Sequence, residues 1–172
     1  MFWNRIKEFW TKKIVKKKLL NVKHLVTNDS IKKVGILFDV TFFVDKEVFI
    51  SELIKNGIQE ENIFQLVFKN SIKKNESFDC AFFSYKNLSW IGTINKKEVS
   101  EFIQQDFDLL ISYYDTEKSP LMLVTHLSRA TFKVGFASID KRLNHFMVDS
   151  TTENYKVFIF ELFKYLKILN KL

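Results

Sequence analysis

The sequence predicts an α/β protein with three layers, in which helices cover both faces of a mostly parallel sheet of about five or six strands. Short, almost entirely apolar runs alternate along the chain with helical stretches of about ten residues, which is the pattern of βαβ units. A chain of 172 residues, 47% of them hydrophobic, is long enough for one well-packed core. We therefore expect a basic amphipathic helical arm over residues 1–30 and a single α/β domain over residues 31–172.

The N-terminal arm is predicted to be helical over residues 3–25. Its apolar residues recur at intervals of three and four, as on one face of a helix, but in two separate sets. The first set is Trp3, Ile6, Trp10 and Ile14, and the second is Val15, Leu19, Val22 and Val26. The two sets lie on different helix faces, so we expect a bend or two helices with separate partners.

Within the domain, the alternation assigns the elements in order. Strands are predicted at residues 34–38, 63–68, 80–85, 107–113, 131–136 and 145–148, with a further strand-like stretch at 88–91. Helices are predicted at residues 46–56, 96–105 and 118–128, and a last one begins at Thr152 or Asn154. Asn56-Gly57 is a typical helix stop, and Pro120 falls in a first helical turn, where proline is tolerated. This order of elements is Rossmann-like.

Composition and the lack of apolar segments suggest where the protein resides. Cys80 is the single cysteine, so no internal disulfide can form, and a reducing compartment suits the chain. No apolar run approaches the roughly 20 residues of a transmembrane helix, and no apolar signal segment follows the basic N-terminus. We expect a cytoplasmic protein.

Catalytic motifs are missing from the sequence. A nucleotide-binding sheet of this kind carries glycines in its first β–α turn, but residues 39–45 have none and begin and end with aspartate. The Walker A, Gly-x-Gly-x-x-Gly and Gly-x-Ser-x-Gly patterns are absent as well. His24, His126 and His145 are far apart and lack metal-ligand spacing. We expect no catalytic residues, no cofactor and no metal, and hence a protein that is not an enzyme.

Asp115 is the best candidate for a small-molecule pocket. It lies just past the carboxyl end of a predicted strand, where α/β proteins bind ligands, and Lys118 and Ser119 follow it. The simpler interpretation is that Asp115 or Thr116 caps the next helix.

Two stretches carry a resemblance to known families: Phe107-Asp-Leu-Leu-Ile-Ser-Tyr-Tyr and Leu127-Ser-Arg-Ala-Thr-Phe-Lys-Val-Gly-Phe136. They are similar to an uncharacterised family of Bacteroidota known only as a domain of unknown function. That resemblance covers most of residues 30–170 and implies no activity. The same stretches loosely resemble the Rossmann-like N-terminal half of heptosyltransferase-type glycosyltransferases. The donor-sugar site of those enzymes lies largely in a C-terminal half, so this resemblance implies a degenerate relative and not a complete glycosyltransferase.

Positive charge is concentrated at the N-terminus. Residues 1–33 contain ten basic and two acidic side chains, whereas the other 139 residues contain 17 basic and 18 acidic ones. The whole net charge of +7 therefore belongs to this region, which predicts an anionic partner. Its basic residues are Arg5, Lys7, Lys12, Lys13, Lys16, Lys17, Lys18, Lys23, Lys32 and Lys33.

RNA is the partner that we expect first. Lysines that bind phosphates release counterions, and Trp3, Phe9 and Trp10 can stack on bases or fill a groove. Arg129 and Arg142 are the arginines of a second, weaker basic region that also contains His126, Lys133, Lys141 and His145. A small neutral domain with a basic helical extension is common among ribosome-associated proteins. We therefore expect ribosomal RNA and neighbouring ribosomal proteins as partners, with no specificity for DNA.

Two other interpretations of the arm remain open. Its aromatic residues and lysines are typical of an interfacial helix on an anionic membrane surface. Alternatively, the arm packs on its own domain and its lysines are simply solvated.

Overall fold

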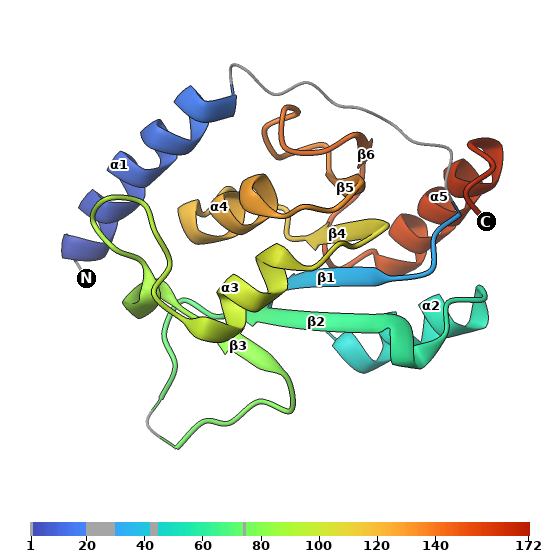
Figure 1. Cartoon of the computed structure of the whole chain (residues 1–172), viewed down its shortest axis with the longest axis horizontal. Coiled ribbons are helices and arrows are strands. Elements are labelled where there is room, and N and C mark those ends of the chain that lie inside the picture. The colour runs from blue at the N-terminus through green and yellow to red at the C-terminus, as the bar shows by residue number, and fades with distance from the viewer. Residues whose placement is uncertain (1, 20–29, 42–44, 74) are drawn as a thin grey trace.

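The computed structural model contains a six-stranded sheet in which all strands are parallel, in the order β3-β2-β1-β4-β5-β6 (Figure 1). The structure describes residues 2–19, 30–41, 45–73 and 75–172, the first four of them by their backbone alone. The strands are β1 (Val34–Asp39), β2 (Ile63–Phe68), β3 (Ala81–Phe83), β4 (Leu109–Tyr113), β5 (Phe132–Phe136) and β6 (Phe146–Val148). The predicted Rossmann-like α/β fold is confirmed.

Helices cover both faces of the sheet. On one face, α2 (Lys46–Lys55) contacts α5 (Tyr155–Ile168), and on the other α3 (Lys97–Gln104) contacts α4 (Ser119–Leu127). The N-terminal helix α1 (Phe2–Lys18) packs against α4. Two short 3-10 turns, η2 (Glu60–Asn62) and η3 (Tyr85–Asn87), precede β2 and follow β3. The three predicted layers are present because consecutive crossovers that run in opposite directions along the sheet place their helices on opposite faces.

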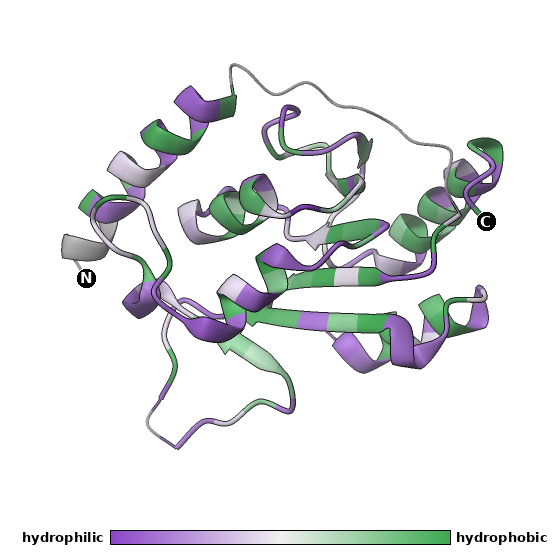
Figure 2. Cartoon of the chain, in the orientation of Figure 1, coloured by the Kyte–Doolittle hydropathy of each residue, from purple (hydrophilic) through white to green (hydrophobic). Residues whose placement is uncertain are grey.

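Aromatic rings fill the core on the side of α2 and α5. The ring of Tyr113 in β4 lies 4.4 Å from that of Phe49 in α2 and 5.3 Å from that of Phe158 in α5, measured between centroids. Phe38 of β1 joins the same cluster, and all four rings are almost wholly buried. The strands are correspondingly hydrophobic along most of their length (Figure 2).

Gly35 is required by the opposite face of β1. A Cβ atom at this position would lie 2.6 Å from the ring of Phe107, well inside van der Waals contact. Asp108, the next residue, accepts hydrogen bonds from the backbone N–H groups of Lys32 and Lys33 at 2.9 and 2.7 Å. Residues 107 and 108 therefore fix the entry of β1 into the sheet, at its amino edge.

Two predicted elements differ from the structure. The strand-like stretch 88–91 contributes a single bridge, from Leu88 to Ile94, because a capping box at Ser84 starts a 3-10 turn and Gly92 with φ 74° turns the chain back. The helix predicted over residues 3–25 ends at Lys18, and residues 20–29 lie outside the described part. Of the two apolar sets in the arm, the buried one includes Val15 and Leu19.

Candidate functional site

A buried ion pair occupies the carboxyl edge of the sheet where the strand order reverses. Asp39 ends β1 and Lys118 precedes α4. The Nζ atom of Lys118 lies 2.5 Å from Oδ2 of Asp39, and each side chain is 8% exposed. Thr41 accepts a hydrogen bond from Lys118 Nζ at 2.9 Å and donates one to Asp39 at 2.5 Å. Open α/β sheets bind ligands at this position, and here three side chains bind one another.

The first β–α turn is also closed by its own residues. Oδ1 of Asp45 accepts a hydrogen bond from the backbone N–H of Val48 at 3.2 Å and so caps α2. In dinucleotide-binding proteins a phosphate takes this place at the helix N-terminus. Asp45, one of the two aspartates at the ends of this turn, therefore fills that place itself, while residues 42–44 lie outside the described part.

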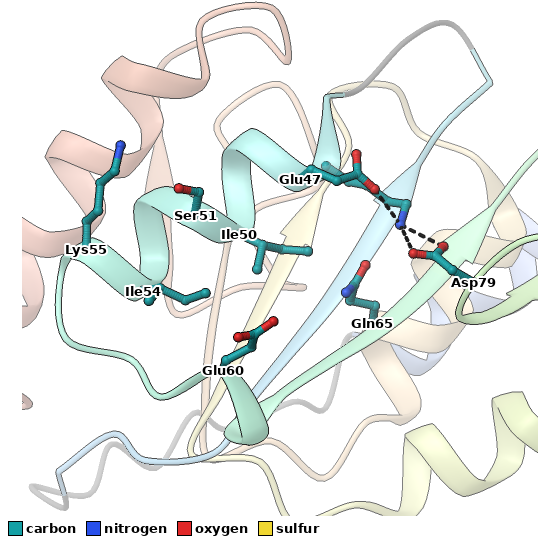
Figure 3. Close-up of a pocket in the computed structure, with 9 residues that line it drawn as sticks. Glu47, Ile50, Ser51, Ile54, Lys55, Glu60, Gln65 and Asp79 are labelled. Atoms are coloured by element: carbon teal, nitrogen blue, oxygen red, sulfur yellow. Dashed lines mark hydrogen bonds and ion pairs between the residues drawn. The ribbon is translucent and has the colours of Figure 1, made fainter.

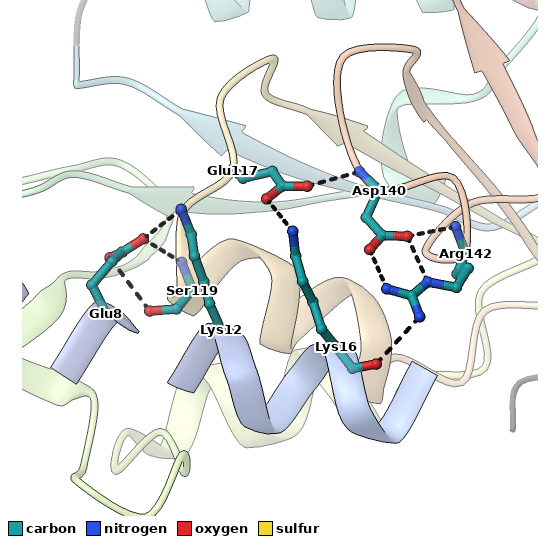
Figure 4. Close-up of polar contacts among 7 residues, drawn as sticks. All are labelled: Glu8, Lys12, Lys16, Glu117, Ser119, Asp140 and Arg142. Carbon is teal, nitrogen blue, oxygen red and sulfur yellow. Dashed lines mark hydrogen bonds and ion pairs between the residues drawn. The ribbon is translucent and has the colours of Figure 1, made fainter. Parts of the chain in front are cut away.

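Glu8 of α1 caps α4. Its carboxylate accepts hydrogen bonds from the backbone N–H of Ser119 at 3.0 Å and from the Ser119 hydroxyl at 3.4 Å, while Lys12 lies 3.3 Å away (Figure 4). Lys118, at the N-cap position, makes no side-chain cap of its own. A carboxylate suits the positive end of a helix.

Glu8 also affects a tyrosine of η3. Burial, and then a hydrogen bond to Glu8, raise the pKa of Tyr85 above its usual range, so this phenol stays protonated.

A second polar cluster joins the last turn of α1 to the loops after β4 and β5. Nζ of Lys16 lies 2.9 Å from Glu117, whose other oxygen accepts from the backbone N–H of Asp140 at 3.2 Å. Arg142 donates to Asp140 with Nε at 2.9 Å and Nη2 at 2.6 Å, and with Nη1 to the Lys16 carbonyl at 3.4 Å (Figure 4). The guanidinium of Arg142 lowers the pKa of Asp140. Glu8, near the middle of α1, and Lys16, in its last turn, thus attach the helix to the carboxyl edge.

The opposite side of α1 faces solvent and is basic and aromatic. We call Phe9, Trp10, Lys13, Lys17 and Lys18 the outer α1 face, because all five are exposed. Spacings of three and four residues place most of them on one side of the helix. The rings of Phe9 and Trp10 meet edge to face at 6.0 Å, and Lys13 Nζ lies 5.7 Å from the Trp10 ring. Phe9 is 64% and Trp10 52% exposed, which is unusual for side chains of this size.

The loop that follows η3 contacts α1 and also carries exposed apolar side chains. Lys7 of α1 donates a hydrogen bond to the Leu88 carbonyl at 3.1 Å, and its Nζ lies 5.1 Å from the ring of Trp90. Trp90 is 48% and Ile91 77% exposed. Four large apolar side chains, two from α1 and two from this loop, therefore stand out near lysines. Trp90 and Ile91 were not predicted as surface residues, because residues 88–91 have the apolar pattern of a strand.

The other predicted RNA contacts are dispersed. Lys32 and Lys33 lie at the amino edge, about 20 Å along β1 from the end that α1 covers. Lys33 Nζ donates to Gln105 at 2.5 Å. Arg129 is exposed after α4. Trp3 and Arg5 belong to α1, but their side chains are outside the described part, as is all of Lys23.

Asp115 takes a role that the sequence did not indicate. It does not cap α4, since that helix begins at Ser119 and receives Glu8. Its Oδ2 accepts hydrogen bonds from the backbone N–H of Thr152 at 3.1 Å and from the Thr152 hydroxyl at 3.0 Å. Asp115 therefore joins the end of β4 to the turn before α5. The interpretation as a helix cap, for Asp115 or for Thr116, is not what the structure shows.

A groove with a volume of about 410 Å³ opens on the α2 side of the sheet (Figure 3). Lys46 on its wall lies 2.8 Å from both oxygens of Asp79 and 2.9 Å from Glu47. Burial raises the pKa of the neighbouring Cys80 thiol to about 11, so the thiol is protonated at neutral pH and is a poor nucleophile. Over the residues that the structure describes, no cluster of three or more metal-ligating side chains occurs.

Comparison with known protein families assigns this chain to a family. The model of a family of unknown function, DUF6913, matches residues 7–169. The chain belongs to that family. Searches of curated proteins and of solved structures returned no match. The membership predicted from residues 107–136 is confirmed at the level of a family without known activity, and the family match covers most of α1 as well as the sheet. None of the described helices is both long and apolar enough to cross a bilayer.

Proposed function

We propose that this protein binds RNA, ribosomal RNA in the first instance, through the outer α1 face. One observation carries the proposal: α1 turns its described carboxylate, Glu8, toward its own domain and turns two aromatic rings and three lysines toward solvent. A helix that served only to cover α4 would have no need of exposed rings on its far side. Lysines beside such rings suit a ligand that carries phosphates and flat bases.

The attachment of α1 supports recognition as well as stability. Glu8 and Lys16 hold the helix at two points, about two turns apart. The rings of Phe9 and Trp10 are therefore presented from a fixed helix, and little conformational freedom is lost when a base stacks on them. Lys13, Lys17 and Lys18 supply affinity without sequence preference. Neighbouring ribosomal proteins would contact the neutral domain.

A charge-reversal variant tests the proposal. In Lys13→Glu/Lys17→Glu/Lys18→Glu, we expect the affinity for RNA to fall about tenfold or more, and the slope of log affinity against log salt to fall by about 2. The matched control is Lys55→Glu/Lys97→Glu/Lys156→Glu, which removes as much charge from exposed positions on other helices. Filter binding and co-sedimentation with ribosomes, with and without ribonuclease, measure both. Equal losses in the two variants would contradict a specific role for α1.

A membrane surface is the second candidate, favoured by four exposed apolar side chains, Phe9 and Trp10 of α1 and Trp90 and Ile91 of the loop that contacts α1. Apolar side chains among lysines are typical of proteins that lie on anionic lipid. Vesicles with and without phosphatidylserine, free of RNA, separate the two functions. Binding to the vesicles with a blue shift of tryptophan fluorescence, and no ribonuclease-sensitive binding in lysate, would favour the membrane.

The resemblance to glycosyltransferases stays a prediction that no feature of the described residues favours.

A further inference from the structure

The C-terminal helix α5 is apolar on its outer side as well as its inner side. Its inner residues, including Phe158 and Leu162, are buried against the sheet. On the outer side, Val157 is 48%, Phe160 65% and Ile168 62% exposed. Hydrophobic residues accordingly recur along the whole helix in Figure 2. A helix that is apolar all round is usually buried, and contiguous exposed apolar surface marks an interaction site.

The outer residues of α5 form a stripe in which two apolar residues enclose two charged ones. Val157, Glu161, Lys164 and Ile168 follow one another at spacings of four, three and four, the seam of a two-helix contact. Within the helix, Lys164 Nζ lies 3.1 Å from Glu161. The stripe is therefore apolar at both ends, charged in the middle and neutral in sum.

We propose that a second copy of this chain packs on α5, with the two helices antiparallel. A two-fold axis between residues 162 and 163 places Val157 of each copy opposite Ile168 of the other. The same axis places Glu161 opposite Lys164 twice, so each charge of the stripe meets its opposite. Phe160 of each copy lies on the same side of the pair, close to the axis. The stripe is thus complementary to itself, as a two-fold contact requires.

The charges of this stripe favour a second copy over another kind of partner. A basic or acidic partner would leave Glu161 or Lys164 opposite a like charge, whereas the antiparallel copy satisfies both. Tyr165 of α5, 37% exposed, flanks the stripe and widens the contact. One pair of helices about 21 Å long buries less than a standard interface, so we expect a weak, concentration-dependent dimer. The outer α1 face is separate from this contact.

Sedimentation velocity of the full chain at increasing concentration tests the contact. We expect a monomer–dimer equilibrium with a dissociation constant on the order of micromolar to tens of micromolar, and a rise of at least about tenfold in Phe160→Asp. Phe9→Asp is the matched control, because Phe9 is 64% and Phe160 65% exposed. A wild-type chain that stays monomeric up to about millimolar concentration would overturn the proposal, as would equal dissociation constants for Phe160→Asp and the wild type.

Mixing two charge variants tests the register. Glu161→Lys places four lysines at the centre of its own dimer, and Lys164→Glu places four glutamates there, so we expect each alone to dimerise about tenfold or more weakly. Mixed together, the two variants restore both opposite-charge contacts, and a heterodimer is expected near the wild-type affinity. The pair within the helix is lost in both variants, so its loss cannot explain recovery on mixing. Failure to recover, with both variants folded by circular dichroism, would overturn the antiparallel register.

Discussion

The lysines of this protein occupy two environments, and their role differs between the two. On the outer α1 face, Lys13, Lys17 and Lys18 extend into solvent. Among the lysines that are buried or half-buried, the Nζ atom of Lys118 lies 2.5 Å from Asp39, and Lys133 donates to the Thr125 carbonyl at 2.7 Å. The first group is available to a polyanion, whereas the second holds loops and strands together. The same side chain therefore serves binding or stability according to the surface that its helix or strand presents, and substitutions separate the two roles.

The largest effect is expected from the buried pair at the carboxyl edge. Lys118→Met leaves Asp39 buried without its cation, which should lower the free energy of unfolding by about 3–5 kcal/mol. Urea denaturation measures the change. The double variant Asp39→Leu/Lys118→Met removes both charges and should recover most of the loss. A double variant as unstable as the single one would show that the ion pair itself, and not the orphaned charge, sets the stability.

A smaller effect is expected where α1 caps α4. Glu8→Ala removes the carboxylate from the backbone N–H of Ser119, which should cost about 1–2 kcal/mol of unfolding free energy. Glu101→Ala is the control, because Glu101 lies on α3 with a side chain that is 57% exposed and pairs only with Lys97 among the ion pairs seen. We expect that control to change stability by about 0.5 kcal/mol or less. Equal effects would mean that Glu8 contributes no more than a surface charge.

Lys133 should make stability depend on pH. Burial lowers its pKa from 10.5 to about 8 in the folded protein, so above pH 8 the unfolded chain binds a proton that the folded chain has lost. Stability therefore rises with pH in this window, by about 1 kcal/mol between pH 8 and 9. The Cys80 thiol, whose pKa rises from 9.0 in the unfolded chain to about 11 in the folded protein, opposes this rise as the unfolded thiol ionises, weakly from about pH 8 and fully above pH 9. Denaturation at several pH values should show the rise in the wild type and lose it in Lys133→Met.

The smallest effect on stability is expected from the outer α1 face. Lys13→Ala and Lys17→Ala should each change the unfolding free energy by about 0.5 kcal/mol or less, since exposed lysines contribute little. The same variants should weaken RNA binding measurably. A loss of stability comparable to that of Glu8→Ala would show that these lysines pack against the domain, and the division between the two groups of lysines would fail.

The sheet was predictable because local patterns determine it. Apolar runs such as residues 34–38 and 63–68 are too short for helices and too hydrophobic for loops, and both became central strands. The family membership was also readable from residues 107–136. The turn at Trp90 was not, because its apolar letters resemble a strand and only the cap at Ser84 and the geometry of Gly92 reveal it. In the candidate site, the outer lysines were foreseen, whereas Glu8 was passed over although it is one of two acidic residues in a basic segment.

The sequence by itself determined the layered parallel fold, the lack of a glycine-rich phosphate loop, and the gathering of positive charge at the N-terminus. Each of these features depends on residues that are neighbours in the sequence, because strand hydrophobicity and charge density are local properties. Only the tertiary structure decided which lysines face solvent and which are buried. That choice depends on the rotation of α1 about its axis, and the rotation is set by contacts between residues far apart in the chain, such as Glu8 with Ser119. No pattern within seventeen residues of helix specifies a partner that lies beyond a hundred positions away.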